Sequence, residues 1–338
     1  MSQQLLIMNT QFKNLPELLD FFKEETNCKE YYEQQRWGGN VACPHCGSLK
    51  IYRTNRGFKC GEKLCAKKFT VTTGTVFENT KITLRLWFSA MYLISTSKKG
   101  ISSLQLAEQL GITQKTGWFL NHRIREMLKD AVSTKLTGTV EVDETFVGGK
   151  NKNRHKDKKV ENSQGRSYKD KTPVVGLLQR SEYEIIERDH KVIKGRTVKE
   201  KVIIKPSIVK LQVATDTQQK TVEPILDTHV ENGVTVYSDE WHAYNNLKDN
   251  YDHSIVNHSI KEYVNGMVHT NGIEGFWSIL KRGYIGIYHS MSKEHLKRYC
   301  VEFAFRYNNK ELTGREKFDI ALQQVSTARI TYKTLIGK

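Results

Sequence analysis

The sequence lacks long apolar runs and a leader-like start. Nowhere in its 338 residues is there an uninterrupted stretch of the roughly 18 apolar residues that a membrane span needs. The N-terminus, MSQQLLIMNTQFKN, does not have the pattern of a secretory signal peptide. Internal repeats are also absent. We therefore expect no membrane partner, a cytoplasmic location and no repeat architecture.

Acidic residues are in short supply. The chain has 53 Lys and Arg residues against 37 Asp and Glu residues, and the resulting net charge of +16 is spread along its length. An excess of this size favours a polyanionic partner, most commonly nucleic acid, over a merely soluble basic protein. The length allows two or three domains, one of them large enough to bury a substantial core.

Cysteine is infrequent, but four of the six cysteines form two close pairs. Two residues separate Cys43 from Cys46, four separate Cys60 from Cys65, and thirteen lie between the pairs. In a reducing compartment this pattern favours metal binding over disulfide or redox chemistry. Four thiolates on two tight turns suit tetrahedral Zn²⁺, so we predict a zinc ribbon over residues 37–80 with these four cysteines as ligands. Such a segment is too small to fold without its metal.

Helical patterns flank the ribbon on both sides. Apolar residues at helical spacing predict one helix over the N-terminal segment, residues 1–36, to which we assign no chemistry. Residues 81–132 predict further helices, and the run ISSLQLAEQLGITQKTGWFLNHRIREML has the layout of a helix-turn-helix. Gly111 makes the turn, and Thr113 caps the second helix. The residues expected to pack the first helix are Leu104, Leu106, Ala107 and Leu110.

The second helix of this pair is expected to contact DNA. It carries the basic residues Lys115 and Arg123, which could meet phosphates or base edges. Helix-turn-helix patterns are weak evidence alone, but a neighbouring zinc ribbon and the net charge of +16 favour the DNA-binding interpretation.

Residues 137–310 alternate between strand-like and helix-like segments. In the predicted order, several strands are followed by a helix, another strand and more helices. This is the order of an RNase H-like mixed-sheet fold, in which the first and fourth strands are neighbours. Within this region, residues 150–171 form a basic insertion that is either a phosphate contact or a solvated loop. A helical tail, residues 311–338, follows, and the whole predicts a multidomain α/β protein. The expected strands are 139–146, 172–180, 183–189, 210–214, 233–238 and 254–259, and the expected helices include 221–230 and 241–251.

Three acidic residues are placed where they could share metal ions. Asp143 and Asp239 each end a strand-like run, the position from which open α/β sheets present functional groups. Glu274 lies in the helix pattern HTNGIEGFWSILK and could be an ordinary solvated residue if taken alone. Together the three could hold two divalent cations about 4 Å apart, which clamp a phosphodiester during in-line displacement. The apolar face of the helix pattern consists of Ile273, Phe276, Trp277 and Leu280, and the polar face of Asn271, Glu274, Ser278 and Lys281.

Six motifs occur in order over roughly residues 37–310: CPHCGS, CGEKLC, KKFTVTTGTVF, EVDETFVGG, YSDEWHAY and HTNGIEGFWSILKRG. In this combination the chain resembles a bacterial insertion-sequence transposase of the DDE class, in the zinc-ribbon group related to the eukaryotic Merlin elements. That class belongs to the RNase H-like, retroviral integrase superfamily. Each motif alone would be weak, but the combination is specific.

The resemblance implies that Asp143 and Asp239 are the first two ligands of Mg²⁺ or Mn²⁺. Glu274 is the implied third ligand, since the 34 residues between it and Asp239 are the usual gap in this superfamily. Members of the group can have an asparagine where others have the acidic ligand, and Asn271 faces the same side as Glu274. We assign the ligand to Glu274 and expect Asn271 and His269 to support the site or to contact DNA.

The same resemblance implies a DNA transposase. The ribbon and the helix-turn-helix would bind the terminal inverted repeats of the element, Lys281 would touch DNA, and the acidic site would hydrolyse the phosphodiester and join the freed end to target DNA. Because both ends must be held together, we expect a homo-oligomer on DNA, associated with the nucleoid. Two other functions remain open: a DNA-binding regulator with an inactive C-terminal half, and a nuclease with an RNase H-like fold.

Overall fold

The computed structural model describes residues 12–128, 134–149, 155–161, 171–189, 193, 196–256, 267–326 and 330–337. The chain divides into two compact units, which are described separately below: Met1–Ala131 with Asn309–Lys338, and Val132–Asn308. In the described ranges, no helix is both long and apolar enough to span a membrane. Most of the expected basic insertion, residues 150–171, lies outside the described residues.

The first unit is a set of helices around an aromatic core. Phe88 is at its centre, with its ring centroid 4.9 Å from that of Phe22 and 5.4 Å from that of Phe318. Because Phe318 belongs to the C-terminal tail, the tail is part of this core and not a separate segment. The helices of the unit are α2 (Leu15–Phe21), α3 (Glu25–Trp37), α4 (Leu84–Thr96), α5 (Ser103–Leu110), α6 (Gln114–Met127), α10 (Gly314–Gln323), η6 (Gln324–Ser326) and α11 (Tyr332–Leu335).

The single helix expected over residues 1–36 is wrong, because α2 and α3 are separate helices. Phe22 is the C-cap residue of α2, and its ring centroid lies 5.2 Å from that of Tyr31 in α3. In one continuous helix these residues would be about 13 Å apart along the axis. Burying both aromatic rings in the same core therefore requires the chain to bend between them.

The zinc-ribbon segment forms a small antiparallel sheet of β1 (Ile51–Thr54), β2 (Gly57–Cys60) and β3 (Lys68–Phe69). Phe58 and Phe69 stack with ring centroids 5.4 Å apart. The other buried residues of the cluster around this sheet are Cys43 and Cys60. An apolar core of this size stabilises a fold only weakly, as expected of a ribbon that depends on a metal.

The turn and the cap predicted between α5 and α6 are confirmed. Gly111 has a positive φ of 64°, and the Thr113 hydroxyl accepts a hydrogen bond from Thr116 N. Leu104, however, was expected in the core and is 67% exposed. It precedes the buried Leu106 by two positions, or about 200° around the helix, so the two side chains cannot share one face.

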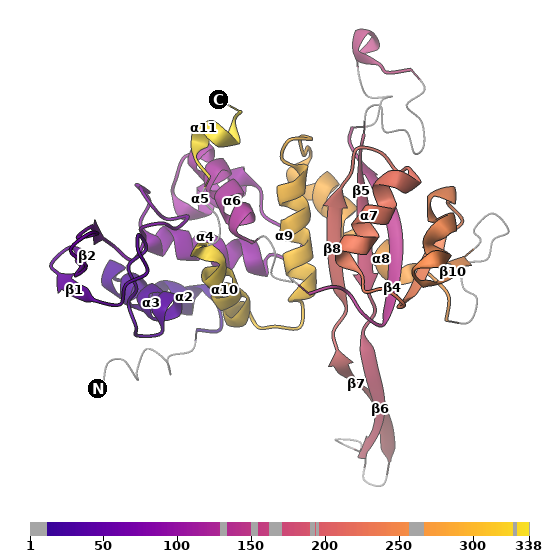
Figure 1. Cartoon of the computed structure of the whole chain (residues 1–338), viewed down its shortest axis with the longest axis horizontal. Coiled ribbons are helices and arrows are strands. Elements are labelled where there is room, and N and C mark those ends of the chain that lie inside the picture. The colour runs from indigo at the N-terminus through magenta and orange to yellow at the C-terminus, as the bar shows by residue number, and fades with distance from the viewer. Residues whose placement is uncertain are drawn as a thin grey trace. The chain divides into compact units, whose positions relative to one another are not determined.

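The second unit is built on a five-stranded mixed sheet with the order β10-β9-β4-β5-β8 (Figure 1). The pairs β4–β5 and β5–β8 are antiparallel, whereas β4–β9 and β9–β10 are parallel. The first and fourth strands of this sheet, β4 and β9, are neighbours, as expected. The strands are β4 (Thr139–Val147), β5 (Thr172–Gln179), β8 (Ile208–Val213), β9 (Thr235–Asp239) and β10 (Asp252–Val256).

A separate hairpin, β6 (Glu182–Asp189) with β7 (Thr197–Lys205), extends beyond the end of this sheet (Figure 1). Strand β7 was not expected. All residues of β6 and most of β7 are exposed, so the alternation of buried and exposed residues that identifies a strand in a sequence is missing.

Helices cover both faces of the five-stranded sheet. Successive residues of β4 point to opposite faces, so its side chains contact helices on both sides. Val140 and Val142 pack with α7 (Gln219–His229) and with η3 (His242–Asp249), a 3₁₀ helix where an α-helix was expected. Val147 packs on the opposite side. The elements there are α8 (Asn271–Gly283), the π-helical turn η5 (Tyr284–Tyr288) and α9 (Leu296–Asn308), and the expected apolar face of α8 is buried against the sheet.

Candidate active site

Asp143 and Asp239 lie at matching positions on neighbouring parallel strands. The register of β4 with β9 pairs Glu141 with Tyr237, and two further residues along each strand lead to Asp143 and Asp239. Asp239 is the last residue of its strand, as expected. Asp143 is not: its strand continues to Val147, because β4 remains paired with β5 after β9 has ended.

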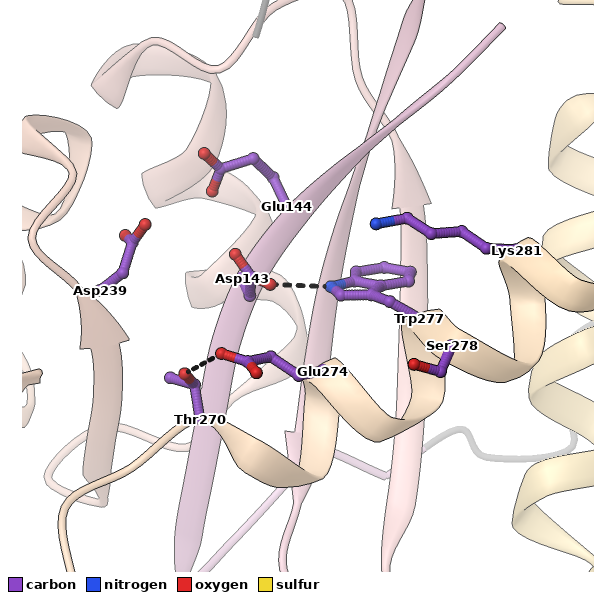
Figure 2. Close-up of a pocket in the computed structure, with 8 residues that line it drawn as sticks. All are labelled: Asp143, Glu144, Asp239, Thr270, Glu274, Trp277, Ser278 and Lys281. Carbon is purple, nitrogen blue, oxygen red and sulfur yellow. Dashed lines mark hydrogen bonds between the residues drawn. The ribbon is translucent and has the colours of Figure 1, made fainter. Parts of the chain in front are cut away.

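Helix α8 brings Glu274 to the same place. An open cleft of about 430 Å³ lies beside the aspartates, and Figure 2 shows the Asp143 carboxylate between those of Asp239 and Glu274. Lys281 lines the cleft from about two turns further along α8. The residues that line the cleft are Asp143, Glu144, Asp239, Thr270, Glu274, Trp277, Ser278 and Lys281.

Asp143 is oriented by an indole ring. Trp277 Nε1 donates a hydrogen bond of 2.9 Å to Asp143 Oδ2 (Figure 2). The ring can lie this close because the residue paired with Asp143 on β5 is Gly176. A Cβ at position 176 would be 2.5 Å from Trp277 Cζ2, closer than any real contact. Trp277, expected only as a core residue, therefore also orients the carboxylate.

The other two acids are also held by hydrogen bonds. Asp239 Oδ1 accepts a hydrogen bond of 3.1 Å from Trp241 N, at the turn that follows β9. The Thr270 hydroxyl donates to Glu274 Oε1 at 3.2 Å (Figure 2). Each of the three carboxylates is thus positioned by a neighbour of its own, which reduces the reorganisation needed when a ligand binds.

Negative charge is concentrated around Asp143. Burial, with further contributions from the charges of Glu144 and Asp239, raises the pKa of Asp143 to about 7. Glu144 was not singled out from the sequence, although it lines the cleft. Its Oε2 accepts a hydrogen bond of 2.7 Å from the buried Tyr244 hydroxyl, and burial together with this carboxylate raises the pKa of Tyr244 well above its usual value. A bound cation would offset this crowded negative charge.

The donor set of the cleft suits a hard divalent cation. Carboxylate oxygens are the ligands that Mg²⁺ and Mn²⁺ prefer in proteins, and four of the lining residues are acids. Burial and the neighbouring carboxylates raise the pKa of Asp143, and a divalent cation would favour its charged form. The residues of the cleft therefore fit the cation that the sequence predicted.

The structure separates the two candidates for the third ligand. Both side chains are exposed, but Glu274 lines the cleft and Asn271, at the start of α8, does not. His269 lies behind the cleft, where its Nδ1 is 2.7 Å from Arg180 Nη2. Burial and the charge of Arg180 lower the pKa of His269. The expectation that His269 supports the site or contacts DNA stays a prediction.

The four cysteines of the ribbon are grouped as the ligands of a metal ion would be. In the described part of the chain, they are the group of potential metal ligands whose donor atoms all lie within 4.8 Å of one another. The Sγ atoms of Cys46 and Cys60 are 3.5 Å apart, and those of Cys43 and Cys65 are 3.8 Å apart. A tetrahedron with Zn–S bonds of about 2.3 Å has edges of about 3.8 Å. The cluster therefore fits one Zn²⁺.

Two protein-family models match segments of this chain. A model described as an ISXO2-like transposase domain matches residues 135–308, just over half of the 338 residues. The chain belongs to the ISXO2-like transposase family. A second model, described as a transposase zinc-ribbon domain, matches residues 23–68 and confirms the predicted ribbon.

Two relatives agree with this family. The chain is 29% identical over 317 residues to an uncharacterized protein in the transposable element ISH50 of Halobacterium salinarum, a match that covers 89% of this chain and 97% of that protein. It is 31% identical over 104 residues to an uncharacterized transposase-like protein of Haemophilus influenzae, a match that covers 30% of this chain and 83% of that protein.

Helices α5 and α6 lie between the two segments that the family models match. Of the two DNA contacts expected on α6, Lys115 is exposed. The structure contradicts the expectation for Arg123, which is 7% exposed. Its guanidinium lies over the rings of Trp87 and Phe119, at 4.9 and 5.2 Å from their centroids. Arg123 packs α6 against α4 within the unit, because its planar cation stacks well on aromatic rings.

Sequence reasoning also missed residues that support the cleft. Gly176 was part of an expected strand, but nothing in a sequence shows which aromatic ring approaches a glycine in three dimensions. Glu141 and Glu144 did offer a signal, since a strand that is buried on both faces rarely carries charged residues unless they are paired or functional.

Proposed function

We propose that this family member is a DNA transposase that cuts DNA at the ends of its element and joins the freed ends to target DNA. The observation that supports this most directly is the cleft in which Asp143, Asp239 and Glu274 meet beside Lys281. The strand order supports an RNase H-like fold, because three antiparallel strands are followed by two parallel ones. These three acids are the residues to which we assign catalysis.

The proposed ligands of two Mg²⁺ or Mn²⁺ ions are Asp143, Asp239 and Glu274, with Asp143 between the other two (Figure 2). When bound, such ions polarise the phosphodiester and lower the pKa of a water molecule that attacks it. The chain contributes the carboxylates, and Trp277 and Thr270 hold two of them in place.

The remaining lining residues suit a nucleic-acid backbone. The ammonium group of Lys281 can pair with a phosphate next to the scissile bond, and the Ser278 hydroxyl, one turn before it, can donate to a phosphate oxygen. The cleft is open to solvent, which is consistent with a DNA backbone as its ligand. Hydrolysis leaves a 3′-hydroxyl, which then attacks target DNA, and no covalent link between protein and DNA is formed.

DNA recognition is assigned to the first unit. The zinc ribbon and the helix pair α5–α6, as a helix-turn-helix, would bind the terminal inverted repeats, with Lys115 at a phosphate. The net charge of +16 supports a salt-dependent contribution that is independent of sequence. Two ends must be cut and joined together, so the working form is proposed to be a homo-oligomer on DNA.

Each of the two alternative functions leaves part of the structure unexplained. A DNA-binding regulator would have no use for four acids around one cleft, one of them with a pKa raised to about 7. A simple nuclease would share the cleft but would not need two DNA-binding modules ahead of it.

The decisive experiment is a strand-transfer assay with a supercoiled plasmid and DNA carrying the ends of the element. In Mg²⁺, the protein should cut at the ends and produce joined products. Cleavage without joining would favour the nuclease, and binding to the ends without cleavage would favour the regulator.

A further inference from the structure

We propose that the ion pair between the buried Glu141 and the partly buried Arg180 is a positioning device that holds the three acid-bearing elements in register. The inference rests on the proposed function only in naming those acids as catalytic. Neither residue lines the cleft, so both act through other residues. The geometry below is independent of the reaction.

The first element is β4. Glu141 lies two residues before Asp143 and points to the same side of the strand. It is 1% exposed, and its Oε1 accepts a hydrogen bond of 2.6 Å from Arg180 Nε. A buried carboxylate is costly unless it is paired, and here the pair fixes the strand that carries Asp143.

The second element is β9. The guanidinium of Arg180 lies 4.8 Å from the centroid of the Tyr237 ring. Tyr237 is the strand partner of Glu141, and it lies two residues before Asp239. The ion pair thus contacts both parallel strands at the same level, two residues before each aspartate.

The third element is α8. Arg180 Nη1 donates to Met267 O, and its Nη2 donates to His269 O, each at 2.7 Å. Glu141 Oε2 accepts a hydrogen bond of 2.8 Å from Ile273 N, the residue before Glu274. The first N–H groups of a helix have no acceptor within the helix. Here the carboxylate of Glu141, a residue of β4, is the acceptor for one of them.

Gly272 shows how closely α8 approaches this ion pair. A Cβ at this position would be 2.8 Å from Glu141 Oε2 and 3.0 Å from Oε1. Its side chain must therefore be a hydrogen atom if the first turn of α8 is to reach the carboxylate. This accounts for the glycine of the HTNG motif, to which the sequence alone gave no role.

One ion pair therefore contacts all three acid-bearing elements within a few residues of each acid. Losing either partner should shift α8 relative to the two strands and separate Glu274 from Asp143 and Asp239. Residues that orient metal ligands from behind typically affect metal affinity or activity by about 10- to 100-fold.

The same unit offers a matched control. Glu302 and Arg306 form another buried ion pair, within α9, and Glu302 Oε1 also accepts a hydrogen bond of 2.6 Å from Tyr288 Oη in η5. These contacts join α9 and η5, neither of which carries one of the three acids. Glu302→Gln should cost stability as Glu141→Gln does, without acting on the cleft.

The test compares Glu141→Gln, Arg180→Lys and Glu302→Gln in the full-length protein. Denaturant unfolding measures stability, and isothermal titration measures Mn²⁺ binding to the zinc-loaded protein. Both variants of the pair should weaken Mn²⁺ binding about tenfold or more, whereas Glu302→Gln should bind Mn²⁺ like wild type at comparable stability. Wild-type Mn²⁺ affinity in folded Glu141→Gln, or an equal loss in the control, would overturn the proposal.

A double-mutant cycle makes the inference sharper. Gly272→Ala should weaken Mn²⁺ binding in the wild-type background, because the added methyl group clashes with the Glu141 carboxylate. In a Glu141→Ala background the clash is gone, so the same change should have little further effect. Additive effects would mean that Gly272 and Glu141 act separately, against the proposal.

DNA cleavage is measured on the same proteins as a separate readout. If wild type binds Mn²⁺ but does not cut DNA, the proposed function fails while the ion-pair comparison still stands. If wild type cuts DNA and Glu141→Gln cuts equally well, the ion pair is structural only.

Discussion

The cysteine cluster and the carboxylate cleft are both suited to metal ions, but their ligands come together in different ways. In the ribbon, all four cysteines fall between residues 43 and 65, on two turns joined by a short hairpin. In the cleft, Asp143 and Glu274 are separated by more than a hundred residues and lie on different elements. Local chain geometry is enough to bring the thiolates together, whereas the carboxylates depend on the packing of a whole sheet and a helix.

This difference predicts different failures. Loss of zinc should unfold the ribbon, because its apolar core is small. Loss of the cation from the cleft should leave the second unit folded, because its two large apolar clusters do not involve the acids. The following predictions are ordered from the largest expected effect to the smallest.

The largest effect should come from the ribbon. A Cys43→Ser, Cys60→Ser double variant should lose its zinc and unfold locally, since structural zinc contributes on the order of 10 kcal/mol in small zinc-dependent folds. Elemental analysis and limited proteolysis measure both effects. Cys28→Ala, which changes a buried cysteine outside the cluster, should keep one zinc per chain. If the ribbon stays folded without zinc, its fold does not depend on the metal, and the predicted difference between the ribbon and the cleft is wrong.

The next effect concerns the two aspartates. Asp143→Asn and Asp239→Asn should each reduce DNA cleavage about a thousandfold or more, because a neutral amide keeps the shape but recruits a divalent cation poorly. Binding to the element ends, measured by gel shift, should stay close to wild type. Asp249→Asn, at the exposed end of η3, is the matched control and should cut normally. Cleavage by either site variant would remove that residue from the active site.

The third prediction distinguishes the two candidates on α8. Glu274→Gln should reduce cleavage about 100-fold or more, because Glu274 lines the cleft. Asn271→Ala should lose less than about tenfold, because Asn271 lies outside the lining. Both variants are assayed on the same DNA ends in Mg²⁺ and in Mn²⁺. An inactive Asn271 variant beside an active Glu274→Gln would reverse the assignment.

The smallest effect is on stability as a function of pH. The pKa of Asp143 is raised from 3.8 to about 7 in the folded protein, so the folded state holds this proton more tightly than the unfolded chain. Without a divalent cation in the cleft, the stabilisation is complete below about pH 4 and is lost as the pH rises through 7. A shift of about three pKa units corresponds to at most about 4 kcal/mol. Because the side chain borders an open cleft, solvent screening should reduce the measured fall to on the order of 2 kcal/mol.

Urea unfolding of the zinc-loaded protein at several pH values measures this fall. Asp143→Asn should flatten the profile, because the amide does not titrate, and Mn²⁺ should restore stability at pH 7 and above. A wild-type profile that stays flat between pH 4 and 7 would show that the cleft tolerates its charge without a cation.

Several features could be predicted because they depend on nearby residues. The zinc ligands follow from cysteine spacing, and the turn at Gly111 with its Thr113 cap follows from the conformational preferences of those two residues. The buried face of α8 follows from helical periodicity. The ribbon motifs, in order with those around Asp143, Asp239 and Glu274, were sufficient to identify the family.

Other features were decided only by tertiary structure. Asp143 lies within a strand because β5 remains paired there, and Arg123 is buried because Trp87 of another helix lies beneath it. In both cases the deciding partner is distant in the sequence, and hydrophobic spacing describes which face of an element is buried but not which residues it contacts. Strand β7 pairs with the adjacent β6 and was missed for another reason, since no face of it is buried.

The sequence by itself determined the chemistry of this protein: four thiolates for zinc, three well-placed acids, a basic chain and the family to which it belongs. Tertiary structure decided the arrangement, because only folding brings β4, β9 and α8 together around one cleft. The contact of the Trp277 indole with Asp143, made possible by Gly176, depends on distances that no spacing in the sequence encodes.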